Sequence, residues 1–539
     1  MDRQYTFAAN ERPLLPGAPY TPMHPLSRRL GYAAIGTIAG IGSTLGNGLV
    51  NVNYSTIAGS MGLYVFEAAL LPAIYVAFNV SANLMLVKGR IQFGVPAITH
   101  GLLLIYAAMA ALQLVFPGLA TAILVRAASG MAGAGLITFS LFNWLQVMPP
   151  KRRPWALVLG ISIPQLGLPL ARLFPVELLA QQGWQAVHLT ELAIALVLLG
   201  ASLALPLPPS EKTKVCGRCD LLTFCLILLG MLALGTVLGE GRLLWWTDTP
   251  WLGWVLAFSV LAFAAAIIVE QDRTLPVLQL RWLSSFDIVR FAGVALLVRL
   301  ALAEQTYGAV GLLTSGGLSN DQLRWLFVAV TIAMLLGMGV VILTLAEKRL
   351  IWLIVTAALV IAAGAFLDTN ATNVTRPPQL YLSQCLIAFG TTLFVGPSLV
   401  YGFLRMLQRG PDHFVSFIVL FSSTQNLGGL AGASLLGSYQ VMAAKFHAAA
   451  LSEHLTGFDP QVVARIQAGA GGVAGAIADP TLQSKEGVAL LGQALTREAN
   501  ILAYNDVFCF VGILALLTAG YLAYHGIARL LRRPAEAAP

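Results

Sequence analysis

Length, composition and charge exclude a soluble globular protein. The chain has 539 residues, of which 57% are hydrophobic and only 10% are charged, and its mean hydropathy is +0.77. A soluble domain carries about 25% charged residues, so water would not solvate a surface made from this composition. The formal net charge is +8, but the basic residues fall in short loops between apolar runs, which argues against a nucleic-acid surface.

Residues 1–27 are polar and rich in proline, and we expect them to form a cytoplasmic tail. Fourteen apolar runs follow, each long enough for a membrane span, which needs about 20 mostly apolar residues. They lie near residues 30–50, 63–87, 94–115, 118–145, 154–173, 185–206, 220–239, 250–269, 286–313, 322–345, 349–367, 379–403, 413–440 and 505–528. The runs are too long and too uniformly apolar for barrel strands, so they predict an all-α polytopic membrane protein whose solvent is the lipid bilayer.

The placement of Lys and Arg predicts the orientation. With the N-terminus in the cytoplasm, the tails and even-numbered loops hold about three times as many Lys and Arg residues as the odd-numbered loops. This is the bias of the positive-inside rule, and an odd number of spans would destroy it. We therefore expect both termini in the cytoplasm and an even number of spans.

The connection 447–504, between the last two spans, is the longest and is predicted to face outward. Asp459-Pro460 and Asp479-Pro480 each predict a helix start, because Asp caps a helix and proline fits its first turn. Between them, residues 468–475 read Ala-Gly-Ala-Gly-Gly-Val-Ala-Gly and predict a flexible hinge. We expect two helices joined by this hinge, the second running on into the last span. The hairpin is either a passive loop or a docking surface for a partner.

Four segments, in order along the chain, resemble motifs of the EmrB/QacA-type drug:proton antiporters of the major facilitator superfamily. They are residues 50–62 (VNVNYSTIAGSMG), 124–135 (LVRAASGMAGAG), 423–432 (STQNLGGLAG) and 497–508 (REANILAYNDVF). The resemblance implies the major facilitator fold, with two six-helix bundles and a central two-helix insertion. The corresponding divisions are the tail 1–27, an N-terminal bundle 28–209, a central helix pair 210–280, a C-terminal bundle 281–533 containing the helical loop 447–504, and a tail 534–539.

The chain also departs from that family. Its members usually have an Asp in the first span, where this sequence reads Leu45-Gly46-Asn47-Gly48. The loop after the second span normally carries an Asp and two basic residues, but residues 86–94 (LVKGRIQFG) keep only the basic and glycine elements. The Gly-Pro motif of the fifth span is reduced to residues 162–167 (SIPQLG). Proton coupling therefore cannot use an acid in the first span.

Ionisable groups deep in a span indicate function, because each costs about 2.5 kcal/mol or more to insert. Glu304 in the ninth span is our first candidate for proton coupling, with Arg126 and Arg299 as its coupling partners. Arg126 resembles the fourth-span arginine of the family, which faces the central cavity. The alternative for Glu304 is a static ion pair with Arg299, Arg126 or Arg172, or exposure at the outer mouth. The alternative for Arg126 is a structural role on backbone carbonyls.

Five other ionisable residues fall near span ends, where side chains reach water, and we expect them to be interfacial: Glu67, Glu191, Asp506, Asp287 and Arg290. We expect polar and aromatic side chains of the first, second, fifth and ninth spans to line a substrate cavity. The candidates are Asn47, Asn51, Tyr75, Gln165, Gln305 and Tyr307. Such a lining favours a neutral, aromatic or weakly acidic amphipath.

The sequence contains no Gly-rich nucleotide loop and no catalytic or metal-binding constellation, so we expect neither an enzyme nor a bound cofactor or metal. An ion gradient would supply the energy. We predict a secondary active exporter of hydrophobic or amphipathic small molecules, a proton antiporter in a bacterial inner membrane. From the resemblance, a periplasmic adaptor of the membrane-fusion type and an outer-membrane channel are expected partners at 447–504. The alternatives are a dedicated exporter of one endogenous metabolite and, given the missing first-span acid, a non-transporting membrane scaffold.

Overall fold

The computed structural model describes residues 11, 13, 17–174, 184–271, 273 and 276–531. All the regular secondary-structure elements in these residues are helices, as the sequence predicts. The predicted tail 534–539 and the first ten residues of the predicted tail 1–27 lie outside the described residues.

Within this part of the chain, thirteen helices are long and apolar enough to cross a membrane. The ninth predicted span is the one missing from that count, because its helix is interrupted. It consists of α13 (Phe286–Ala301), the π-helix η4 (Glu304–Ala309) and α14 (Val310–Ser315). Neither α-helical piece is long enough alone, but together they make a fourteenth crossing.

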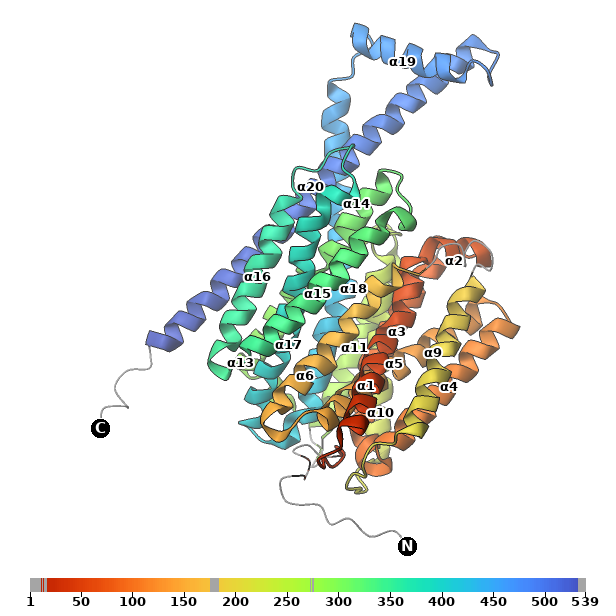
Figure 1. The fold of residues 1–539 in the computed structure, drawn as a ribbon. Helices are drawn as coiled ribbons and strands as arrows, with labels where there is room; N and C mark the ends of the chain where they lie inside the picture. Colours follow the sequence, from red (N-terminus) through yellow and green to blue (C-terminus); the bar gives the residue numbers. More distant parts are fainter. Residues whose placement is uncertain are drawn as a thin grey trace.

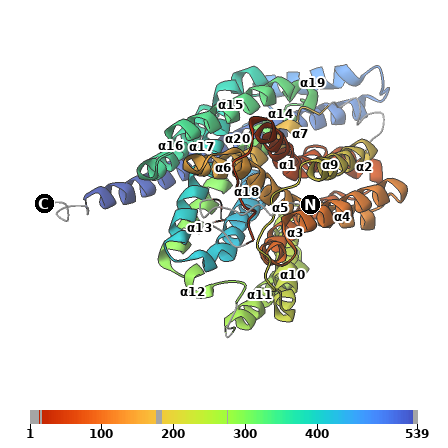
Figure 2. The same ribbon diagram turned by 60° about the horizontal axis from the view of Figure 1, so that its bottom comes forward.

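The helices form two bundles with a helix pair at one edge (Figures 1 and 2). The first bundle contains α1 (Leu26–Val52), the short α2 (Tyr54–Met61), α3 (Val65–Phe93), α4 (Val95–Val115), α5 (Leu119–Val147), α6 (Arg153–Ser162), η3 (Ile163–Leu166), α7 (Gly167–Ala171) and α9 (Trp184–Ala204). The second contains α13 to α14, α15 (Arg324–Thr344), α16 (Leu350–Leu367), α17 (Tyr381–Leu407), α18 (Phe414–Glu453) and α20 (Pro480–Leu531). The central pair is α10 (Arg218–Glu240) and α11 (Pro250–Gln271), and α12 (Leu280–Leu283) follows it.

The fifth crossing bends between the bundles. Pro164 has no backbone N–H to donate, so the α-helix cannot continue regularly through it, and a 3-10 turn, η3, connects α6 to α7. Gly167 then packs against α1, where a Cβ would lie 2.1 Å from Thr44 Oγ1. This close approach brings the polar residues of the broken helix to the centre of the molecule.

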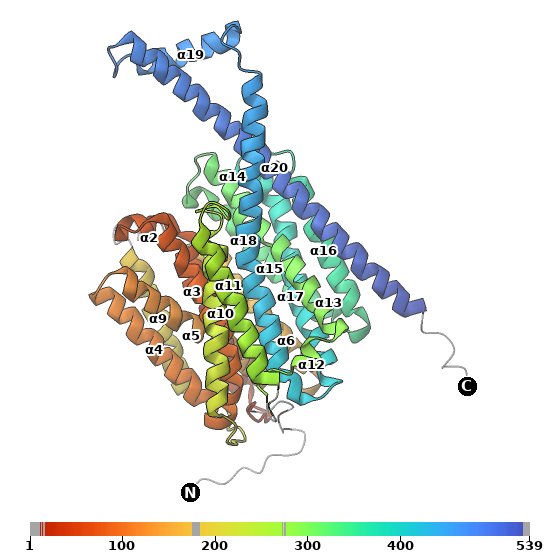
Figure 3. The same cartoon turned by 180° about the vertical axis from the view of Figure 1, so that it is seen from behind.

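The predicted outward connection is a long helical hairpin (Figure 3). Helix α19 (Pro460–Val473) and helix α20 begin at the two predicted starts. The Asp459 and Asp479 carboxylates accept from the backbone N–H groups of Gln461 and Thr481, each at 2.8 Å. The hydroxyl and backbone N–H of Thr481 hold the pKa of Asp479 below its usual range, so this cap stays ionised.

The predicted hinge at 468–475 is largely wrong, because α19 continues as a helix to Val473. A glycine of this segment allows two helices to pack closely and does not form a hinge. A Cβ on Gly487 of α20 would lie 2.3 Å from the carbonyl oxygen of Ile466, and one on Gly469 would lie 3.3 Å from the Cα of Gly487. The two glycines let α19 lie directly on α20. Helix α1 begins and α20 ends at the end of the bundles opposite α19 (Figures 1 and 3), as an even number of crossings requires.

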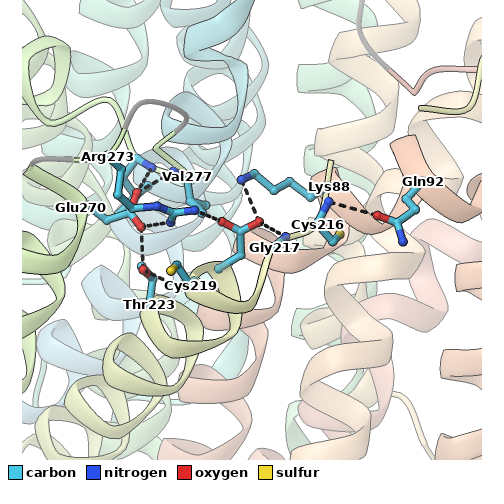
Figure 4. Close-up of polar contacts among 11 residues, drawn as sticks. Lys88, Gln92, Cys216, Gly217, Cys219, Thr223, Glu270, Arg273 and Val277 are labelled. Carbon is cyan, nitrogen blue, oxygen red and sulfur yellow. Dashed lines mark hydrogen bonds and ion pairs between the residues drawn. The ribbon is translucent and has the colours of Figure 1, made fainter. Parts of the chain in front are cut away.

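A buried charge network ties the central pair to the first bundle (Figure 4). Lys88 Nζ, at the end of α3, donates to Asp220 Oδ2 of α10 at 2.9 Å. Arg273, after α11, pairs with both Asp220 and Glu270. Residues 86–94, predicted to form a loop, lie in the last turns of α3 up to Phe93. They contain no acid, and Asp220 supplies a carboxylate to Lys88 from another helix.

The same network reaches the second bundle. Glu270 accepts from the Thr223 hydroxyl and from the backbone N–H groups of Val277 and Leu278, which lead out of α11. The next N–H, of Gln279, donates to Ser416 Oγ of α18 at 2.8 Å. A continuous series of ion pairs and hydrogen bonds therefore connects this end of the central pair to α3 on one side and to α18 on the other.

Candidate functional site

A cavity of about 250 Å³ lies between the two bundles. Side chains of α1, α3, α5 and the broken fifth crossing line it on one side, and those of α13, η4, α15, α17 and α18 on the other. The lining includes five of the predicted substrate residues: Asn47, Asn51, Tyr75, Gln165 and Gln305.

Tyr307 is not among the described lining residues. Its hydroxyl accepts a hydrogen bond of 2.7 Å from Arg242 and donates one of 3.3 Å to Gln440. Gln305 and Tyr307 are two positions apart, so their side chains do not share a face of the helix. Tyr307 joins the C-terminal end of α10 to η4 and α18 instead of facing the cavity.

Sequence reasoning missed the contribution of α18 to the cavity. Asn83 Nδ2 of α3 donates to Ser422 Oγ at 3.1 Å, and Asn426 Nδ2 donates to Asn79 Oδ1 at 3.1 Å. Gln425 also lines the cavity, and neither of its side-chain polar atoms has a partner. Two adjacent amides within the apolar span 413–440, Gln425 and Asn426 of the quoted segment 423–432, could have indicated that this helix lines the cavity.

Beside the cavity, two buried carboxyls share one amide; we call Glu304, Asp368 and Gln384 the carboxyl site. Gln384 Nε2 donates to Glu304 Oε1 at 3.1 Å and to Asp368 Oδ2 at 2.7 Å. The exposed fractions of Glu304, Asp368 and Gln384 are 0%, 1% and 1%. No basic side chain of the described chain forms an ion pair with either carboxyl, and the second oxygen of Glu304 has no partner. Both the ninth-span acid predicted from sequence and an unpredicted acid, Asp368 at the end of α16, make this site.

Gln305 connects the carboxyl site to the cavity. Its Nε2 donates to the backbone carbonyl of Gln384 at 3.1 Å, and its side chain also lines the cavity. Glu304 and Gln305 open the π-helix, an irregularity that is frequent at functional sites. A ligand that touches Gln305 is thus one residue away from the buried carboxyls.

The two predicted coupling arginines do not contact Glu304 in this conformation. Arg126 pairs with Glu191, whose other oxygen lies 2.8 Å from His188 Nδ1. Glu191 is fully buried, so its predicted interfacial position is wrong; the outer turn of α9 packs into the bundle to meet Arg126. Arg172 donates to Asn320, across the bundle interface.

Arg299 faces the cavity. Its Nε donates to the backbone carbonyl of Gln425 at 3.0 Å, and it is one of the lining residues. The arrangement therefore separates the charges predicted to act together: Glu304 lies in the carboxyl site, Arg299 at the cavity and Arg126 in an ion pair of the first bundle. Among the residues with described positions, no group of three or more His, Cys, Asp or Glu side chains could hold a metal ion.

Comparisons with known proteins agree on the fold. A bacterial homologue of the human drug peptide transporters PepT1 and PepT2 aligns over 94% of this chain and 100% of its own, with a TM-score of 0.55 and 12% identity. The human organic anion transporter MFSD10 (TETRAN) aligns over 91% of this chain and 100% of its own, with a TM-score of 0.52 and 12% identity. Tetrameric PepTSo2 aligns over 94% and 99%, with the same score and identity.

This chain has the major facilitator fold. The predicted fold is thereby confirmed, and the described residues have the many apolar helices of a multi-span membrane protein. No protein-family model matches the sequence, and no curated protein matches it either. At 12% identity the major facilitator structures share the fold alone with this chain.

Proposed function

We propose that the protein is a secondary active exporter of hydrophobic or amphipathic small molecules, of the EmrB/QacA type, which exchanges substrate for protons by alternating access. The observation that carries the proposal is the carboxyl site. Two buried carboxylates that share one donor and have no described counter-ion repel each other and are poorly solvated. A proton on either carboxyl would relieve this repulsion, so the pair is suited to bind and release protons.

The position of Gln305 would couple substrate binding to proton binding. Substrate in the cavity would displace or engage this amide, and the change would reach Gln384, which donates to both carboxyls. Binding of substrate and binding of a proton would then favour different arrangements of Gln305 and the carboxyl site. Exchange of substrate for protons requires such competition. This site would take the place of the acid that is missing from the first span.

The test is transport in proteoliposomes under an imposed pH gradient, with a compound library as substrate. Glu304→Gln and Asp368→Asn should each abolish proton-driven accumulation while exchange of labelled for unlabelled substrate continues. Glu453→Gln is the matched control, because Glu453 is exposed at the end of α18. Normal proton-driven transport by both carboxyl variants would refute the assignment.

A dedicated exporter of one endogenous metabolite is the second candidate, and the cavity volume favours it. About 250 Å³ lies just below the usual range of about 300–1,000 Å³ for drug-sized pockets. A susceptibility panel on cells that express the protein distinguishes the two candidates. Protection against several chemical classes supports the multidrug exporter, and protection against a single class supports the dedicated one.

We also propose that the hairpin of α18, α19 and α20 docks a periplasmic adaptor, with the chain in a bacterial inner membrane and both ends in the cytoplasm. Four large apolar side chains of the hairpin are more than half exposed: Phe446, Phe458, Leu482 and Val488. Phe458→Ser combined with Leu482→Ser should lower efflux from cells but leave transport in proteoliposomes unchanged. Unchanged efflux from cells would count against an adaptor at this surface.

A further inference from the structure

The cavity contains a single fixed charge. Of its described lining residues, Arg299 is the only one that is charged at neutral pH. The others are apolar side chains, glycines, hydroxyls and amides. A ligand in the cavity therefore meets one cation and no anion.

No acidic side chain in the described chain neutralises Arg299. It forms no ion pair, and its one hydrogen bond is to the Gln425 carbonyl. Glu304, five residues along the same crossing, bonds to Gln384 instead. A guanidinium held this way lacks a counter-ion, and an incoming carboxylate or similar group would provide one with bidentate geometry.

Two glycines of α18 make room for the arginine. A Cβ on Gly428 would lie 2.9 Å from Arg299 Cγ, and one on Gly429 would lie 3.3 Å from Arg299 Nη2. The glycines allow the stem of Arg299 to lie flat on α18. The guanidinium then lies beside the Gln425 carbonyl, to which it donates.

Unpaired amide groups near the arginine provide further polar contacts. Gln425 Nε2, Gln425 Oε1 and Asn47 Oδ1 are buried at the cavity and have no hydrogen-bond partner. Buried polar atoms without partners are rare in folded proteins. Here they point to a polar ligand or water between the bundles.

We propose that the substrate cavity selects organic anions, with Arg299 binding the negative group of the ligand and the amides of Gln425 and Asn47 contacting its polar atoms. The proposal rests on the proposed function to the extent that the cavity is the substrate site. The apolar lining holds the body of the ligand, so the class is an amphipathic anion such as an aromatic carboxylate. Expulsion of an anion in exchange for a proton would also move net charge, so a negative interior potential would drive it.

The test uses three probes of one shape and different charge: 2-naphthoate, 2-naphthamide and 2-naphthylmethylamine. Calorimetry on the detergent-purified full chain should show 2-naphthoate binding about ten-fold or more tightly than the neutral amide, with the ammonium probe weakest. Arg299→Gln should bring the naphthoate affinity to that of the amide, and Arg299→Lys should retain part of the preference. Arg290→Gln, on the same helix but outside the cavity lining, is the matched control.

Gly429→Ala provides a variant that keeps the charge. Its Cβ should displace the guanidinium and weaken naphthoate binding selectively, which separates positioning of Arg299 from loss of the fold. Equal affinity of wild type for naphthoate and naphthamide, an unchanged preference in Arg299→Gln, or no binding of any probe would each overturn the proposal. Because binding is measured without a gradient, anion-selective binding without proton-driven transport would refute only the transport function. Proton-driven transport without charge preference would refute only the anion assignment.

Discussion

Two groups of buried ionisable residues in the membrane-spanning helices differ in their partners. Arg126 has a carboxylate partner in Glu191, which also bonds to His188. Glu304 and Asp368 have only an amide between them. The Arg126–Glu191 ion pair is already neutral. The carboxyl site has no cation among the described residues, so its net charge depends on the protons that it holds. The coupling proposed for this protein therefore belongs to the carboxyl site, and the role proposed for the Arg126–Glu191 pair is structural.

Removing one partner of the Arg126–Glu191 pair should destabilise the protein. Glu191→Gln leaves a buried arginine without its counter-ion, which costs about 3–5 kcal/mol. Thermal unfolding of the purified protein should show a lower midpoint, and the double variant Arg126→Leu with Glu191→Leu should recover much of the loss. A stable Glu191→Gln protein that has lost transport would instead give this pair a coupling role.

The sequence revealed Glu304 but not its partner, for a physical reason. Glu304 lies inside an apolar run, where a carboxyl is conspicuous, whereas Asp368 follows the run 349–367 and has the sequence position of an interfacial residue. Only the packing of α16 against α17, and of α17 against η4, brings Asp368 and Gln384 to it. Glu191 was misplaced for the same reason, since hydropathy gives depth along a helix but not the direction in which a side chain points.

At the scale of elements, the central pair depends on Asp220, which accepts from Lys88, Arg273 and the backbone N–H of Gly217. Asp220→Asn removes the charge from these bonds, each worth about 1.5–3 kcal/mol. The junction between α3 and α10 should then open about ten-fold more often, measured as faster hydrogen exchange over residues 86–94 and 210–220. Asp248→Asn, exposed at the other end of the pair, should change neither segment.

If Asp220→Asn left exchange unchanged, the network would not be what attaches the pair to α3. The two spans of the pair were predicted from their apolar runs, and their central place from the family resemblance. The attachment of the pair was not predicted, because the acid that holds Lys88 is 132 residues away in sequence.

The hairpin gives a second prediction at this scale. Gly487→Ala would place a Cβ against the Ile466 carbonyl and push α19 off α20. Limited proteolysis should then cut faster between residues 455 and 480. Gly492→Ala is the control on the same helix, since a Cβ there meets nothing within 4 Å, and its higher helix propensity should stabilise α20 by up to about 1 kcal/mol. Equal cleavage of both variants would show that α19 does not depend on this contact.

At the scale of the whole molecule, hydropathy predicted fourteen crossings and charge bias predicted both ends on one side, because each signal is local or strictly alternating. The division into bundles came only from the family resemblance. Hydropathy and charge bias did not predict the cavity wall contributed by α18 or the interruption at η4. Both depend on how the bundles meet, and that interface joins residues far apart in the chain, such as Asn83 and Ser422.

Alternating access requires the interface between bundles to open, and one contact near the α19 end allows a direct test. Asn320 accepts from Arg172 of the first bundle, and its amide donates to the Val52 carbonyl at 3.3 Å. In a background without the five native cysteines, Arg172→Cys with Asn320→Cys should be joined by a short thiol cross-linker. Transport should fall at least about ten-fold, because the bundles can no longer separate at this end.

The control pair lies within one bundle. Asn373 Nδ2 of the second bundle donates to Glu498 Oε1 at 2.6 Å, so cross-linking Asn373→Cys with Glu498→Cys joins residues that move together and should leave transport intact. Loss of transport in the first pair alone identifies rocking of one bundle against the other as the moving step. Full transport by the molecule cross-linked at 172 and 320 would mean that this interface stays closed, and the alternating-access mechanism proposed for this chain would be wrong.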